Sequence, residues 1–147
     1  MFDLAAIIQT FRERPGQPER LVSRLRDLVG LTVQILINDD SGEQREAWQR
    51  LLRPTDVYVR SDNVHEVRAY NRLAREFANA SVIVFLQGDN CLPVPSLPDG
   101  SAWVHEALYL FRRMPRLGVL GGHAGFDSPS LATGFGPYPR RAPIPYY

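Results

Sequence analysis

The 147-residue sequence contains no lysine, and all 17 of its basic residues are arginine. Any reaction that depends on a lysine amine is therefore excluded. A receiver-type signalling domain, which clusters aspartates around Mg²⁺ but also needs a lysine, is excluded with it. The single cysteine, Cys91, has no partner for an intramolecular disulfide, and it rules out a multi-cysteine metal site.

Long apolar runs are also missing from the sequence. No stretch of about 18 apolar residues exists to span a membrane, and the N-terminus lacks the basic start and apolar stretch of a secretory signal. We therefore expect no membrane segment in this chain and a soluble protein, cytoplasmic by default, with a membrane anchor on a longer parent protein left open. The formal net charge of +1 gives no reason to expect nucleic-acid binding through bulk electrostatics.

The composition is that of a globular domain, with 44% hydrophobic and 22% charged residues. Short apolar runs alternate with amphipathic segments, which indicates right-handed βαβ units and a mostly parallel sheet flanked by helices. We expect strands at residues 4–10, 31–37, 57–59, 81–86 and 118–120. We expect helices at 18–29, around Trp48, at 64–77 and at about 101–114.

Two further expectations concern the later part of the chain. In the 64–77 helix, the apolar residues at helical spacing should face the core; they are Val67, Tyr70, Ala74 and Phe77. After Gly121 the sequence is rich in glycine, proline and tyrosine and shows neither helical nor alternating periodicity. The sequence therefore predicts an α/β domain over residues 1–122 and an irregular tail over 123–147.

Acidic residues follow two of the predicted strands. Asp39 and Asp40 come directly after the second strand, and Asp89 follows the fourth. Aspartate after a strand often does no more than make a turn. However, ligands of parallel sheets bind at the carboxyl ends of the strands, where these two loops should meet. Neighbouring carboxylates repel one another and are kept together mainly where a cation or a hydrogen-bond donor compensates them.

Other candidate groups lie near the same predicted edge. Thr10, Phe11 and Arg12 follow the first strand and add hydrogen-bonding groups and an aromatic ring. Arg68 and Asn71 lie on the helix that precedes the fourth strand, one turn apart on a shared face. A solvated helix face is the plainer interpretation of that last pair.

Four of these segments resemble motifs of family 2 glycosyltransferases, which have the Rossmann-like GT-A fold. Residues 36–42 (LINDDSG) resemble the Asp-Asp-Ser turn of that family, and residues 7–11 (IIQTF) look like its opening strand. Residues 68–74 (RAYNRLA) are similar to its Ala-Arg-Asn helix. Residues 85–93 (FLQGDNCLP) resemble its metal-binding Asp-x-Asp segment and the proline after it. The similarity covers about residues 4–122.

The resemblance implies a glycosyltransferase that binds a nucleotide-diphosphate sugar, with a UDP-sugar expected, and transfers the glycosyl unit to an unidentified acceptor (a glycan, lipid or protein). A divalent metal, Mn²⁺ or Mg²⁺, would neutralise the departing diphosphate, and Asp89 is the expected metal ligand. Asp39 and Asp40 would belong to the nucleoside end, where a carboxylate such as Asp40 can accept the N3–H of uracil. The remaining expected nucleotide-binding residues are Thr10, Phe11, Arg12, Arg68, Asn71 and Gly88.

Two departures from the family pattern leave a second interpretation open. Gln87 stands where the family often has an acidic residue. In inverting members the catalytic base lies in a later segment, so the resemblance implies that this chain, which ends at Tyr147, is truncated at its C-terminus and lacks that segment. Catalytic residues therefore stay unassigned. The alternative is a truncated or degenerate glycosyltransferase-like domain that binds a nucleotide without turning it over.

Overall fold

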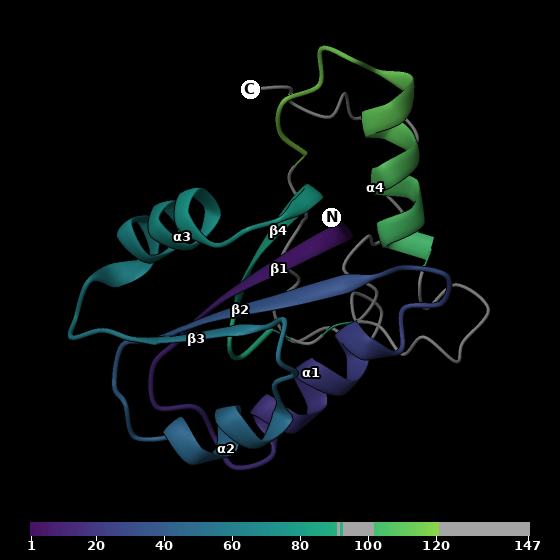
Figure 1. The fold of residues 1–147 in the computed structure, drawn as a ribbon. Coiled ribbons are helices and arrows are strands. Elements are labelled where there is room, and N and C mark those ends of the chain that lie inside the picture. Colours follow the sequence, from purple (N-terminus) through teal and green to yellow (C-terminus); the bar gives the residue numbers. More distant parts are fainter. Residues whose placement is uncertain (91, 93–101, 121–147) are drawn as a thin grey trace, which may run out of the picture. The chain divides into compact units, whose positions relative to one another are not determined.

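The computed structural model describes residues 1–90, 92 and 102–120 of the chain (Figure 1). Met1–Asn90 forms one compact unit, and the residues that follow belong to a second. The elements of the first unit are β1 (Phe2–Thr10), α1 (Gln17–Arg26), β2 (Val33–Asp39), α2 (Arg45–Leu51), β3 (Val57–Arg60), α3 (His65–Glu76) and β4 (Ala80–Gln87). The described part of the second unit holds α4 (Ala102–Arg113), on which Val104 and Leu108 are buried one turn apart.

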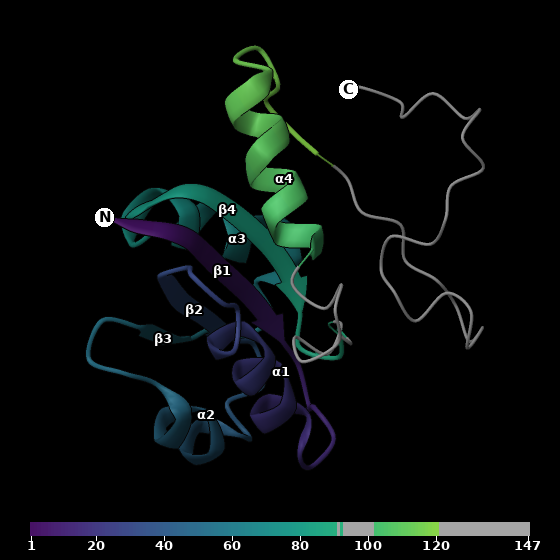
Figure 2. The ribbon, with the colours of Figure 1, turned by 90° about the vertical axis from the view of Figure 1, so that its right-hand side faces the viewer.

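The sheet of the first unit is parallel throughout and has the strand order β3-β2-β1-β4. Ile7 of β1 pairs with Leu36 of β2 on one side and with Phe85 of β4 on the other. Figure 2 shows β1 and β4 side by side, with β2 and β3 continuing the sheet. The strand order reverses between β1 and β4, because the chain adds β2 and β3 on one side before it returns to add β4. The predicted α/β architecture with a parallel sheet is thereby confirmed.

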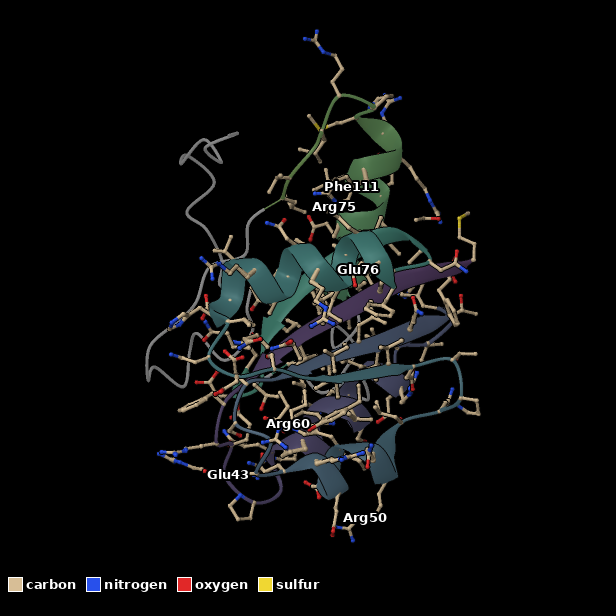
Figure 3. The ribbon with its side chains drawn as sticks, turned by 60° about the vertical axis from the view of Figure 1, so that its left-hand side comes forward. Glu43, Arg50, Arg60, Arg75, Glu76 and Phe111 are labelled. Atoms are coloured by element: carbon tan, nitrogen blue, oxygen red, sulfur yellow. The ribbon has the colours of Figure 1, made fainter. Side chains whose placement is uncertain are left out.

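Helices cover both faces of this sheet. α3 packs on β1 and β2 on one face, whereas α1 and α2 lie together on the other. Figure 3 shows the same division, with Glu76 of α3 on one side of the sheet and Arg50 of α2 on the opposite side. The arrangement explains why β1 and β2 read as continuous apolar runs, since strands covered on both faces have no solvent-facing side.

The core follows from the alternation of side chains along the strands. Ala5, Ile7 and Leu36 face α3 and enclose Leu73, and all four are fully buried. The intervening side chains of β1 and β2 point toward α1 and α2, where Trp48 is fully buried. Burying one such apolar side chain stabilises the fold by roughly 1.5–3 kcal/mol.

Two of the sequence-based predictions are wrong. Val67 does not face the core, because its side chain is 72% exposed and the fully buried positions of α3 are Ala69 and Leu73. Residues 118–120 form no strand; they follow α4 without regular structure. The division at residue 122 and the irregular tail at 123–147 stay predictions, because residues 121–147 lie outside the described part of the chain. Within the described ranges, no helix is long and apolar enough to cross a membrane.

Candidate functional site

A pocket of about 390 Å³ opens at the carboxyl edge of the sheet, beside the ends of β1, β2 and β4. This volume falls in the range of small-molecule sites. The pocket lies where the strand order reverses, which is the usual ligand site of an open parallel sheet. Its lining residues are Gln9, Phe11, Glu13, Asp40, Asn63, His65, Glu66, Gln87 and Asp89.

The Asp40 carboxylate lines the pocket and accepts four hydrogen bonds from the protein. It is 6% exposed. Its Oδ1 accepts hydrogen bonds from the Ser61 hydroxyl and from the Val64 amide, and its Oδ2 accepts from the His65 amide and from Gln9 Nε2. Burial raises the pKa of the Asp40 carboxyl, but these hydrogen bonds outweigh it and hold the pKa below its usual value. Asp40 is therefore an anion at neutral pH.

A buried polar network supports Asp40 from the sheet. Gln9 donates to Asp40, and its own Oε1 accepts a hydrogen bond from Asn38 Nδ2 at 2.8 Å. Asn38 Nδ2 also lies 2.7 Å from the Ser61 hydroxyl. Gln9 and Asn38 pair in register on β1 and β2, so the sheet itself brings them together. Such a network is stable only where each buried polar group has a partner.

Asp39 has a different environment from its neighbour. Its side chain is buried, its Oδ1 accepts hydrogen bonds from the amides of Ser41 and Gly42 and from the Ser41 hydroxyl, and its Oδ2 accepts from Tyr58. Gly42 adopts a left-handed conformation, with φ +68°, which suits glycine. Asp39 thus shapes the turn after β2 and does not line the pocket.

Glu13 reaches the pocket from the loop after β1. Its Oε1 accepts hydrogen bonds from the Thr10 hydroxyl at 3.0 Å and from the Phe11 amide at 3.3 Å. Burial raises the pKa of this carboxyl, and the nearby charge of Asp89 acts in the same direction. Gly88 is buried directly beneath Glu13, so that a side chain at that position would collide with the carboxylate. Thr10 therefore holds Glu13 and Gly88 leaves room for it, and neither lines the pocket itself.

Phe11 forms an aromatic wall at the pocket mouth. Its side chain is 54% exposed, and the Arg12 guanidinium lies 5.1 Å from the ring centroid, within cation–π range. Arg12 also forms an exposed ion pair with Glu43 at 2.9 Å. An exposed ring beside polar groups is suited to stacking against a flat, polar ligand.

α3 contributes its first turn to the pocket, but not the residues expected from the sequence. Glu66 lines the pocket and accepts a hydrogen bond from Gln87, and Tyr70, one turn later, donates to the Leu86 carbonyl at 2.9 Å. Arg68 and Asn71 are exposed and line no part of this pocket; Arg68 borders a separate hollow formed by residues 64–68 alone. Phe11, Asp40 and Asp89 are the predicted residues that share the pocket.

The donor set of the pocket suits a hard divalent cation only in part. Four lining side chains are carboxylates (Glu13, Asp40, Glu66 and Asp89), and oxygen ligands are those that Mg²⁺ and Mn²⁺ prefer. Within residues 1–90, 92 and 102–120, however, no three acidic, histidine or cysteine side chains converge into a ready-made metal cage. The arrangement fits a cation held by one or two carboxylates that completes its coordination with ligand oxygens and water.

Several lining residues were not among the candidates from the sequence. Glu13 and Asn63 lie in the loops after β1 and β3, so the rule that ligands bind at carboxyl ends of strands points to both. Comparison with protein-family models and with curated proteins gave no match to this chain. The relation to family 2 glycosyltransferases therefore stays a resemblance.

Proposed function

We propose that this chain binds a nucleotide-diphosphate sugar together with Mn²⁺ or Mg²⁺, as the donor-binding part of a family 2-like glycosyltransferase with a GT-A fold. The observation that carries the proposal is the pocket at the reversal of strand order, which combines an exposed aromatic ring, Phe11, with the carboxylates Glu13 and Asp89. UDP is the first nucleotide to test, because the resemblance to the family favours a UDP-sugar.

The charge of the pocket makes a specific demand on the ligand. Four carboxylates and no arginine are among the described residues that line it, so a diphosphate entering alone would meet a predominantly negative surface that repels it. A divalent cation reverses the sign of the interaction, because it neutralises carboxylate and diphosphate at once. When bound, such an ion also acts as a Lewis acid on the departing diphosphate. Binding should therefore depend fully on the metal.

The two carboxylates best suited to hold the cation are Asp89 and Glu13. Both line the pocket, and they lie close enough for the charge of Asp89 to raise the pKa of Glu13. Asp40 is less suited, because both of its oxygens already accept hydrogen bonds from the protein. Phe11, which also lines the pocket, would stack against the base.

A non-catalytic nucleotide-binding domain is the second candidate, and one observation favours it. Gln87 occupies the position where the family often has an acid, and its amide donates a hydrogen bond to Glu66 instead of offering an oxygen to a cation. A domain with such a weakened metal site would still bind a nucleotide together with the metal, though less tightly, but would not cleave it.

The test is calorimetric titration of UDP into the chain, with Mn²⁺ and with EDTA. We expect binding only with Mn²⁺. Asp89→Ala should abolish this binding. Asp27→Ala should leave it unchanged, because it removes the same charge from the loop between α1 and the start of β2, away from the carboxyl ends of the strands. Metal-independent binding, or none at all, would contradict the proposal. Release of UDP from a UDP-sugar then separates the transferase from the non-catalytic domain, since both should bind but only the transferase turns the sugar over.

A further inference from the structure

The segment that leads into α3, residues 63–66, supplies three of the pocket-lining side chains: Asn63, His65 and Glu66. Asn63 and His65 both adopt left-handed backbone conformations, with φ +52° and +62°. Such conformations are disfavoured for residues that carry a Cβ, so they persist only where surrounding contacts fix the chain. This wall of the pocket therefore needs an anchor.

The anchor is Asp40, which directly follows β2. Its carboxylate accepts hydrogen bonds from the Val64 amide at 3.0 Å and from the His65 amide at 2.9 Å. The α3 N-terminus has no cap of its own, because its N-cap residue is Val64. Asp40 thus takes the place of an N-cap side chain, and its negative charge suits the positive end of the helix dipole.

Asp40 has no acceptor capacity left for a ligand. Gln9 and Ser61 donate to the same carboxylate, which brings the donors to four, and a carboxylate offers about four acceptor positions. A uracil N3–H could bond to Asp40 only by displacing one of these donors. The displaced donor would then be left buried without a partner, which is unfavourable.

We infer that Asp40 is a positioning residue: it fixes residues 63–66 as a wall of the pocket, and it thereby sets affinity for the whole nucleotide diphosphate rather than the choice of base. This inference rests on the proposed function, but it assigns Asp40 a role other than uracil recognition. Ser61 shares the role, because it donates to Asp40 without lining the pocket.

The test compares UDP with ADP, each titrated with Mn²⁺ into the whole chain. Each Asp40 oxygen accepts from one backbone N–H, Oδ1 from Val64 and Oδ2 from His65. In Asp40→Asn, the side-chain NH₂ replaces one of these oxygens in either orientation, so the segment loses one of its two anchoring hydrogen bonds. We expect the affinities for UDP and ADP to fall together, by about tenfold or more. Hydrogen exchange at the Val64 and His65 amides should become faster. Ser61→Ala should shift the same readouts less, and Asp62→Asn, an exposed neighbour outside the pocket lining, should shift neither.

A fall confined to UDP would overturn the inference, because only a base contact discriminates the two nucleotides. Unchanged affinity for both nucleotides in Asp40→Asn would overturn it as well. If Asp40→Asn does not fold, Ser61→Ala carries the same comparison. A wild-type chain that binds neither nucleotide refutes the proposed function instead. In that case, the amide exchange at Val64 and His65 decides alone whether Asp40 fixes the segment.

Discussion

Gly88 is the position where one added methyl group tests the packing of the pocket. Its backbone lies outside the left-handed region, so alanine is allowed there. The new Cβ would nevertheless collide with the Cδ and Oε1 atoms of Glu13. Gly88→Ala should therefore push Glu13 away from the hydrogen bonds that hold it, those from the Thr10 hydroxyl and the Phe11 amide.

The magnitude follows from those two hydrogen bonds. Thr10 is 2% exposed with Glu13 in place, so displacing Glu13 takes the acceptor away from a buried hydroxyl. Leaving such a buried donor unsatisfied costs about 1–3 kcal/mol. Replacing glycine with alanine at an allowed backbone conformation stabilises by about 0.4–1 kcal/mol through the unfolded chain. The net expectation is a loss of about 1–2 kcal/mol in the free energy of unfolding.

The assay is urea unfolding followed by the fluorescence of Trp48, which is fully buried in the first unit. A Trp103→Phe background removes the second tryptophan signal. Gly88→Ala is measured with Glu13 present, with Glu13→Ala and with Glu13→Gln. The loss should vanish in the alanine background, where nothing remains to collide, and persist with glutamine, which keeps the shape without the charge. An equal effect of Gly88→Ala in all three backgrounds would refute the packing argument.

Two further predictions concern stability away from the pocket. Asp56→Ala should lower the free energy of unfolding by about 2–4 kcal/mol, because it removes the buried carboxylate that pairs with the partly buried Arg26 guanidinium and accepts from the Ile35 amide. In urea unfolding, Asp27→Ala should be near neutral. A loss under about 1 kcal/mol for Asp56→Ala would contradict the reasoning. Burial, with the charges of Glu66 and Asp89, raises the pKa of Tyr70 from 10.0 to about 12. Tyr70 therefore loses its proton at a lower pH in the unfolded chain than in the folded one, and the free energy of unfolding should fall as the pH rises from 10 to 12. In urea unfolding, Tyr70→Phe should make that fall shallower. Part of the fall should remain, because burial also raises the pKa of Tyr58.

The parallel sheet could be predicted from the sequence because β1 and β2 are covered on both faces and read as unbroken apolar runs. The inward face of α3 could not be predicted as securely. Val67 lies at helical spacing with Tyr70 and Ala74, but Ala69 and Leu73 form a second stripe one turn apart. Tyr70, Ala74 and Phe77 also pack against the core beside Leu73, so the two stripes form one broad inward face and Val67 lies beyond its edge. Periodicity alone does not fix where the inward face of a helix ends.

The site was predictable only to the level of the sheet edge. Asp89 and Phe11 follow strands whose carboxyl ends meet, so the sequence placed them correctly beside one pocket. Glu66 and His65 lie in it because the α3 N-terminus is tied across the sheet by hydrogen bonds between residues far apart in sequence. Arg68 and Asn71 share that helix but lie on its exposed face. Which face of a helix a ligand meets depends on tertiary packing that the sequence pattern does not show.

The adjacent acids Asp39 and Asp40 show how strand geometry separates two side chains that the sequence places together. Successive side chains of β2 point to opposite faces of the sheet, so Asp39 joins Tyr58 on one face while Asp40 reaches the α3 N-terminus on the other. Each carboxylate is then compensated by protein donors, and neither needs a cation. Under the proposed function, Glu13 and Asp89, whose charges interact in the pocket, would hold the cation. Removing either of those two carboxylates, rather than Asp39, should therefore weaken metal binding.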